Sequence, residues 1–172
     1  MTVLPEQTSR LDPKTIYPRL WAASLVLLEA CEARGARYYM ISGYRSIPEQ
    51  NLLYAQGRTT PGNIVTKARG GQSYHNQGLA IDFCFDKDRS RPGLQPDFAA
   101  DKYLVLAEEA RKVPGLEPGF FWAFKDCPHV QWVLPAGVAL FRPQQQTKPA
   151  KYLSDVNPDG KNLQGVFTLL GT

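Results

Sequence analysis

The sequence of 172 residues predicts a single α+β domain, in which a small antiparallel sheet packs with about three helices. Some segments repeat apolar residues at helical spacing, whereas others alternate apolar and polar residues as half-buried strands do. The chain is 43% hydrophobic, which is enough for one core, and it is too short for two ordinary domains. We expect the domain to occupy residues 1–134, followed by a tail over 135–172 that packs on it.

The first predicted helix covers about residues 13–34. Asp12 followed by Pro13 is typical of a helix start, and Gly35 is typical of a stop. One apolar stripe runs along this segment at steps of three and four residues, which indicates a helix that packs on a core. The stripe consists of Ile16, Leu20, Ala23, Leu27 and Cys31.

The next segments predict a strand, a helix and a loop. Residues 38–41 are rich in β-prone side chains. Residues 46–57 begin with a capping serine, place a proline in the first turn and end at a glycine, which predicts a second helix. Residues 58–73 contain proline and several glycines, so we expect an extended surface loop, and a loop of this length is usually functional.

The second half predicts three strands and a third helix. Residues 79–85 alternate as a half-buried strand does, with Asp82 on the face away from the core. Helical spacing follows over residues 97–112. Residues 120–134 predict two strands around a turn, and the second places His129 on a polar face with Gln131. The tail predicts at most a short strand at residues 166–169.

Composition narrows the classes of partner. The net charge of +4 and the pI near 9.0 favour anionic partners, but the basic residues are scattered, so we expect no nucleic-acid partner. Three widely spaced cysteines argue against a disulfide framework and favour synthesis in a reducing compartment. The apolar run at residues 20–31 contains Glu29 and is too short to span a bilayer. We therefore expect no export signal and no stable membrane association.

The two histidines of the chain suggest a metal site together with one aspartate. His75, Asp82 and His129 offer imidazole nitrogen and carboxylate oxygen, which are good zinc ligands, and three protein ligands leave a fourth position open for catalysis. One competing interpretation is a closed structural site completed by Cys127. Another is that these are ordinary polar residues beside turns.

Two linked motifs carry a resemblance to a known family. SYHNQGLAIDF (residues 73–83) resembles the SxHxxGxAxD signature of zinc peptidases that cleave D-amino-acid-containing peptides of peptidoglycan, and DCPHVQW (126–132) resembles their DxPHxQ signature. The chain is similar to this VanY-like group, which has a hedgehog-type fold, over about residues 38–133. The upstream segment SGYRSIPEQNLLYAQGRTTPGNIVTKARGG is similar to the L-alanyl-D-glutamate endopeptidases, found as phage endolysins and as bacterial wall-remodelling enzymes. The family often reads WGG where residues 118–120 read PGF, which affects the expected shape of the cleft.

The resemblance implies a role for each matching residue. His75, Asp82 and His129 would hold one Zn²⁺ per chain on one face of the sheet. Asp126 would be the catalytic carboxylate, although it would face away from His129 on a continuous strand unless Pro128 permits a turn. Glu117 and Asp86 are the alternative candidates for the base. Arg45 would face the substrate or the developing oxyanion, and the matching substrate-binding positions are Arg45, Ser73, Gln50 and Tyr54.

Each of the four substrate-binding positions also has a plainer interpretation. Arg45 would be a surface arginine that pairs with Glu49, and Ser73 would be a turn residue. Gln50 and Tyr54 lie four residues apart on the predicted second helix, so their shared face would serve packing.

The expected function is therefore a zinc-dependent peptidoglycan hydrolase that cleaves the L-Ala–D-Glu bond of the stem peptide. The alternatives are a D-Ala-D-Ala carboxypeptidase with the same metal chemistry, and a zinc-containing binding or signalling module without hydrolysis. We expect a monomer that is made in the cytoplasm without a signal peptide. By resemblance to phage lysins, it would act on the wall after release.

Overall fold

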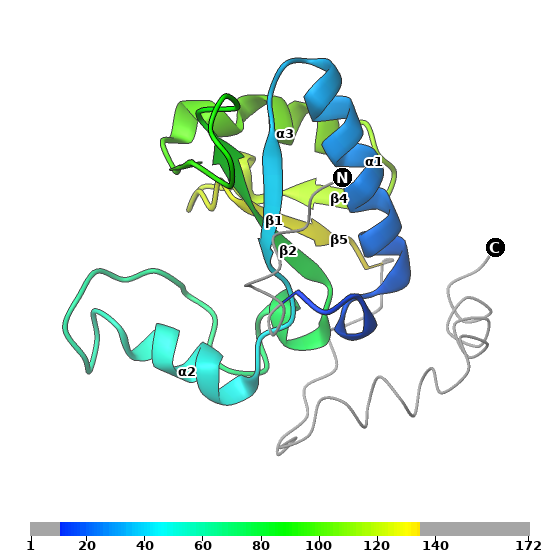
Figure 1. The fold of residues 1–172 in the computed structure, drawn as a ribbon. Coiled ribbons are helices and arrows are strands. Elements are labelled where there is room, and N and C mark those ends of the chain that lie inside the picture. Colours follow the sequence, from blue (N-terminus) through cyan, green and yellow to red (C-terminus); the bar gives the residue numbers. More distant parts are fainter. Residues whose placement is uncertain (1–10, 135–172) are drawn as a thin grey trace, which may run out of the picture. The chain divides into compact units, whose positions relative to one another are not determined.

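The computed structural model describes residues 11–134, which fall into two compact units. Residues 11–45 and 74–133 make the first unit, and residues 46–73 lie in the second (Figure 1). The predicted tail over 135–172, including its short strand, lies outside the described residues.

The first unit is built around an antiparallel sheet. Its strand order is β1-β2-β5-β4, and the short strand β3 also pairs with β2. The α+β class, with a small antiparallel sheet and three α-helices in the described residues, is confirmed. The elements of this unit are α1 (Pro18–Ala33), β1 (Tyr38–Ser42), β2 (Ala80–Asp86), β3 (Pro96–Asp97), α3 (Leu104–Ala110), β4 (Leu116–Pro118) and β5 (His129–Trp132), with 3-10 helices at Pro13–Thr15, Tyr74–Gln77, Ala100–Tyr103 and Gly119–Phe121.

The first helix begins later than predicted. The Asp12 side chain accepts a hydrogen bond from the Lys14 amide, but it caps only the 3-10 turn Pro13–Thr15. Helix α1 starts at Pro18 because a proline is tolerated in the first turn and not in the interior. The predicted end is correct, since Gly35 adopts a φ of 78° directly after the helix.

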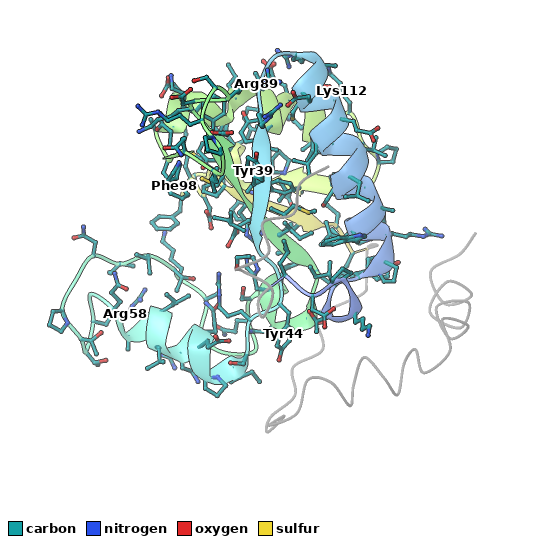
Figure 2. The ribbon with its side chains drawn as sticks, in the orientation of Figure 1. Tyr39, Tyr44, Arg58, Arg89, Phe98 and Lys112 are labelled. Atoms are coloured by element: carbon teal, nitrogen blue, oxygen red, sulfur yellow. The ribbon has the colours of Figure 1, made fainter. Side chains whose placement is uncertain are left out.

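The third helix is shorter than predicted. Asp97 pairs with Phe85 in the sheet, so the chain is still extended where the helical pattern was expected to begin. Phe98 is 57% exposed (Figure 2), and Leu104 is also exposed. The buried side of this segment is formed by Tyr103, Leu106, Ala107 and Ala110.

Only one of the two strands predicted over residues 120–134 is present. Strand β5 lies where it was expected, but its hairpin partner β4 precedes that segment, with Leu116 opposite Trp132. Residues 119–121 form a 3-10 helix instead. The segment PGLEPG (residues 114–119) is rich in turn-forming residues, yet Leu116–Pro118 within it form the edge strand β4.

The alternation along β2 and β5 divides the sheet into two faces. Ile81, Phe83 and Val130 are fully buried on the face that packs against α1 and α3. Asp82 and His129 therefore project from the opposite face. Among residues 11–134, no helix combines the length and the apolar character that crossing a bilayer requires.

Residues 46–73 of the second unit form α2 (Ile47–Ala55) and a loop, as predicted. Ser46 and Glu49 form a capping box at the helix start, a contact worth about 1 kcal/mol. The loop over 58–73 is tied to the helix by side chains. Gln50 donates from Nε2 to the Ala68 carbonyl at 2.8 Å, and Asn51 accepts from the Gly70 amide at 2.9 Å.

Candidate metal centre

Three side chains of the first unit converge on the open face of the sheet. His75 lies in the 3-10 helix Tyr74–Gln77, Asp82 in the middle of β2, and His129 at the start of β5. Asp82 and His129 are direct partners in the β2–β5 register, so the sheet itself brings them together. These three residues form a group that could hold a metal ion.

The ligand atoms lie at separations that suit a tetrahedral ion. His75 Nε2 is 3.1 Å from Asp82 Oδ1 and 3.1 Å from His129 Nδ1, and His129 Nδ1 is 3.4 Å from Asp82 Oδ1. A tetrahedral zinc ion with bonds of about 2.0 Å holds its ligand atoms about 3.3 Å apart. Both histidines are buried, whereas the Asp82 side chain keeps 17% of its surface exposed. The site therefore fits a metal ion with three protein ligands and a fourth coordination position that faces solvent.

Hydrogen bonds orient both imidazole rings for metal binding. His75 Nδ1 lies 2.6 Å from the Gly43 carbonyl, which can only accept, so the ring proton sits on Nδ1 and the Nε2 lone pair faces the cluster. His129 Nε2 lies 3.1 Å from Gln131 Oε1, and this leaves the lone pair of Nδ1 for the cluster. Two lone pairs and a carboxylate that face one another require a proton or a cation between them.

The turn that carries His75 depends on Gly78. This glycine has a φ of 65°, and a Cβ built on it would lie 2.1 Å from the Thr15 carbonyl oxygen. The turn is tied to the segment after β1 because the Arg45 amide donates to the His75 carbonyl at 3.0 Å and Asn76 Nδ2 donates to the Arg45 carbonyl at 2.8 Å. His75 is thus held mainly by backbone groups.

Arg45 adds a positive charge to the site. Its guanidinium donates to Asp82 Oδ2 at 3.4 Å, on the carboxylate oxygen that does not face the histidines. Burial acts to raise the pKa of Asp82, but His75 and His129 outweigh it and hold this pKa well below its usual range. Burial acts to lower the pKa of His129, and the Asp82 carboxylate overcomes it, so the pKa of His129 is raised.

Asp126 lies in a turn and not on a continuous strand, which is the condition that the hypothesis about Pro128 set, and its role as the catalytic carboxylate stays a prediction. The His129 amide donates to the Asp126 carbonyl at 3.1 Å, which closes a turn over residues 126–129 and interrupts the strand. Burial raises the pKa of the Asp126 carboxyl, and the charges of His129 and Asp82 act on it as well. The Asp126 amide donates to the Gly119 carbonyl at 3.1 Å.

Gly119 is the residue of the PGF segment that the site cannot replace. A Cβ at this position would lie 2.6 Å from the Asp126 carbonyl oxygen. The departure from the WGG pattern therefore keeps a glycine at position 119, where the backbone packs closely against that of Asp126.

Two alternatives from the sequence can now be judged. Cys127 packs against the hydrophobic core, which does not support a closed site with a thiolate ligand. Asp86 accepts from the Asp88 and Gln95 amides at 3.3 and 3.1 Å, so it organises the loop after β2. Ser73, Gln50 and Tyr54 lie in the second unit, and their assignment as substrate contacts stays a prediction.

The contacts described in the second unit for two of these residues are internal. Gln50 is fully buried and its amide holds the loop. The ring of Tyr54 carries the Arg58 guanidinium at 3.9 Å from its centroid; Figure 2 labels Arg58 beside α2.

Sequence reasoning missed two residues that orient the ligands. Gly43 acts through its backbone carbonyl, for which a sequence gives no signal. Gln131 could have been found, because it alternates onto the same face of β5 as His129.

Comparisons with known proteins show the family of the chain. A model of the family described as "VanY: D-alanyl-D-alanine carboxypeptidase" matches residues 14–129, and the chain belongs to this family. The chain is 40% identical over 129 residues to the peptidoglycan L-alanyl-D-glutamate endopeptidase CwlK of Bacillus subtilis (strain 168), a match that covers 70% of this chain and 75% of the relative.

Two solved structures share the fold at 18% identity. One is the L-Ala D-Glu endopeptidase ChiX of Serratia marcescens, with a TM-score of 0.50 over 77% of this chain and 90% of that one. The other is the vancomycin resistance D,D-pentapeptidase VanY (E175A mutant) from a VanB-type cassette, in complex with Zn(II), with a TM-score of 0.50 over 87% of this chain and 82% of that one.

Proposed function

We propose that this chain is a zinc-dependent peptidoglycan endopeptidase that hydrolyses the L-alanyl–D-glutamate bond of the stem peptide. The observation that carries the chemistry is the group of His75 Nε2, Asp82 Oδ1 and His129 Nδ1, whose separations of 3.1 to 3.4 Å match a tetrahedral metal site. Support for the choice of bond comes from the 40% identity to CwlK.

In this proposal one Zn²⁺ is held by His75, Asp82 and His129. The ion supplies a Lewis acid that polarises the scissile carbonyl and makes water a good nucleophile at neutral pH. Asp126 takes the proton of the attacking water and returns it to the leaving amine, a role that the raised pKa of its carboxyl favours. Arg45, fixed beside Asp82, offers a positive charge to the oxyanion or to a substrate carboxylate.

The residues proposed to serve substrate binding are Arg45, Ser73, Gln50 and Tyr54. Ser73 and Tyr54 are proposed as direct contacts, and Gln50 is proposed to act by shaping the loop that it holds. The stem peptide carries carboxylates, and the arginines around Tyr54 suit an anionic substrate.

Mass spectrometry of digested peptidoglycan tests the bond. We expect new amino-terminal D-Glu in the products, with loss of activity after zinc removal and recovery after zinc is restored. Free D-alanine as the product would identify a D-Ala-D-Ala carboxypeptidase instead, the activity after which the family is named. An Asp126→Ala variant that still binds zinc but has lost hydrolysis would exclude a purely binding or signalling module.

A lytic role of the endolysin type completes the proposal. The net charge of +4 suits a wall with anionic polymers. We propose that residues 1–134 act as a monomer after release to the wall, with the tail in support. Adding the purified protein to permeabilised bacteria should lower their turbidity, and a truncation after residue 134 should retain peptide hydrolysis.

A further inference from the structure

A chain of hydrogen bonds leads from His129 away from the metal site. His129 Nε2 contacts Gln131 Oε1 at 3.1 Å, and Gln131 Nε2 donates to Glu117 Oε2 at 2.8 Å. The second oxygen, Glu117 Oε1, accepts from the indole nitrogen of Trp122 at 3.0 Å. Glu117 and Gln131 are direct partners in the β4–β5 register, so the sheet fixes their approach.

Trp122, at the end of this series of hydrogen bonds, determines which group donates and which accepts in each of them. The Trp122 indole nitrogen can only donate, and a carboxylate can only accept. Glu117 therefore accepts from both neighbours, and the Gln131 amide must turn its NH₂ group toward Glu117 and its oxygen toward His129. An oxygen at that position requires the proton of His129 to sit on Nε2.

We propose that Glu117 is a positioning residue of the metal site. Through Gln131 it holds His129 in the tautomer whose Nδ1 lone pair faces His75 and Asp82, and its negative charge makes that nitrogen a stronger ligand. This inference rests on the zinc site of the proposed function. It also gives Glu117 a different task from that of catalytic base, since both of its oxygens already accept hydrogen bonds.

An isosteric substitution at Glu117 tests the order of donors and acceptors in this series of hydrogen bonds. In Glu117→Gln, the side-chain oxygen still accepts from Trp122, so the new NH₂ group faces Gln131 and forces its amide to turn round. The Gln131 NH₂ then requires a lone pair on His129 Nε2, which moves the proton to Nδ1, against the metal. We expect zinc affinity to fall about 10- to 100-fold, the usual effect of losing a partner behind a metal ligand.

A second variant should reverse this loss. Adding Gln131→Glu to Glu117→Gln restores the direction of every bond, because the carboxylate at position 131 accepts from both His129 and the amide at position 117. The double variant should recover most of the zinc affinity. Glu29→Gln, an exposed position on α1, is the matched control for the change of one charge and should bind zinc as the wild type does.

Two measurements follow the series: zinc dissociation constants by chelator competition, and ¹⁵N chemical shifts of the His129 ring in the metal-free proteins. At a pH where the His129 ring is neutral, we expect protonated Nε2 in the wild type and the double variant, and protonated Nδ1 in Glu117→Gln. Wild-type zinc affinity and an unchanged tautomer in a folded Glu117→Gln would overturn the proposal, as would equal losses in the single and double variants. Neither measurement uses peptidoglycan, so a wild type that failed to hydrolyse it would count against the proposed function alone.

Discussion

The two histidines of the metal centre are held by regions of different construction. The turn at residues 74–78 and the segment at 43–45 hold His75 through backbone groups, above all the Gly43 carbonyl at 2.6 Å. The hairpin of β4 and β5 holds His129 through the side chains of Gln131 and Glu117. A ligand fixed by backbone resists side-chain substitution, whereas one fixed by side chains can be tuned by it.

Removing either histidine should have the same effect on zinc binding, although the two regions that hold them differ. His75→Ala and His129→Ala each leave two protein ligands, too few for a stable zinc site. We expect both variants to lose stoichiometric zinc in metal analysis and to lose hydrolysis completely. Retention of bound zinc by one of them would show that another side chain completes the site.

Asp126→Asn should separate chemistry from metal binding. Its carboxyl interacts electrostatically with all three residues of the cluster but is not one of the three ligand groups. We expect zinc content to stay at the wild-type level while kcat falls about 10²- to 10⁴-fold, the usual contribution of a general base. Steady-state kinetics on a stem-peptide substrate measure the fall. A near-normal kcat would move the role of base elsewhere.

Gly78→Ala should break the region that is held by backbone. The left-handed φ alone costs about 1–2 kcal/mol for an alanine, and the clash with Thr15 adds about 1–3 kcal/mol. Gly93→Ala is the control, because Gly93 has a φ of 77° with no neighbouring atom within 4 Å. Urea unfolding of the metal-free proteins compares the two. Equal destabilisation would show that the turn can move away from Thr15.

Lowering the pH should change zinc affinity and the stability of the fold through protonation of His129. Its pKa is raised in the metal-free protein, so below that pKa a proton occupies the site and zinc affinity falls about tenfold per pH unit. The sign for stability is the reverse in the metal-free protein. Protonated His129 stabilises the fold fully below its unfolded pKa of about 6.5, and this contribution is lost as pH rises through the folded pKa. Zinc titrations and thermal unfolding from pH 5 to 8 measure both trends.

The sequence alone predicted the three residues that converge better than it predicted the residues that orient them. His75, Asp82 and His129 stood out because histidine is rare in this chain, and the motifs around them are local. The contact from Glu117 to Gln131 depends on the register of β4 with β5. Since β4 has three residues and reads as a turn, no periodic signal could reveal that register.

The helix boundaries show the same contrast: those determined by neighbouring residues were predicted, and the one determined by a distant partner was not. The serine cap of α2 and the stop at Gly35 depend on residues close together in the sequence, and both were predicted correctly. The start of α3 was wrong because Asp97 is drawn into the sheet by Phe85, a partner that local spacing does not show. Pro18 is typical of a helix start, but the apolar stripe that includes Ile16 led to the prediction of an earlier start.

The pairing of Asp82 with His129 gives a bound ion a mechanical consequence. The two residues are 47 positions apart in the chain (from 82 to 129) and sit opposite each other on β2 and β5. A metal held by both would act as a cross-link that closes this long loop, and it would remove chain entropy from the unfolded state as a disulfide does. The three cysteines in the described part of the chain are free, so no disulfide cross-links the sheet there. A bound ion would supply such a cross-link between β2 and β5.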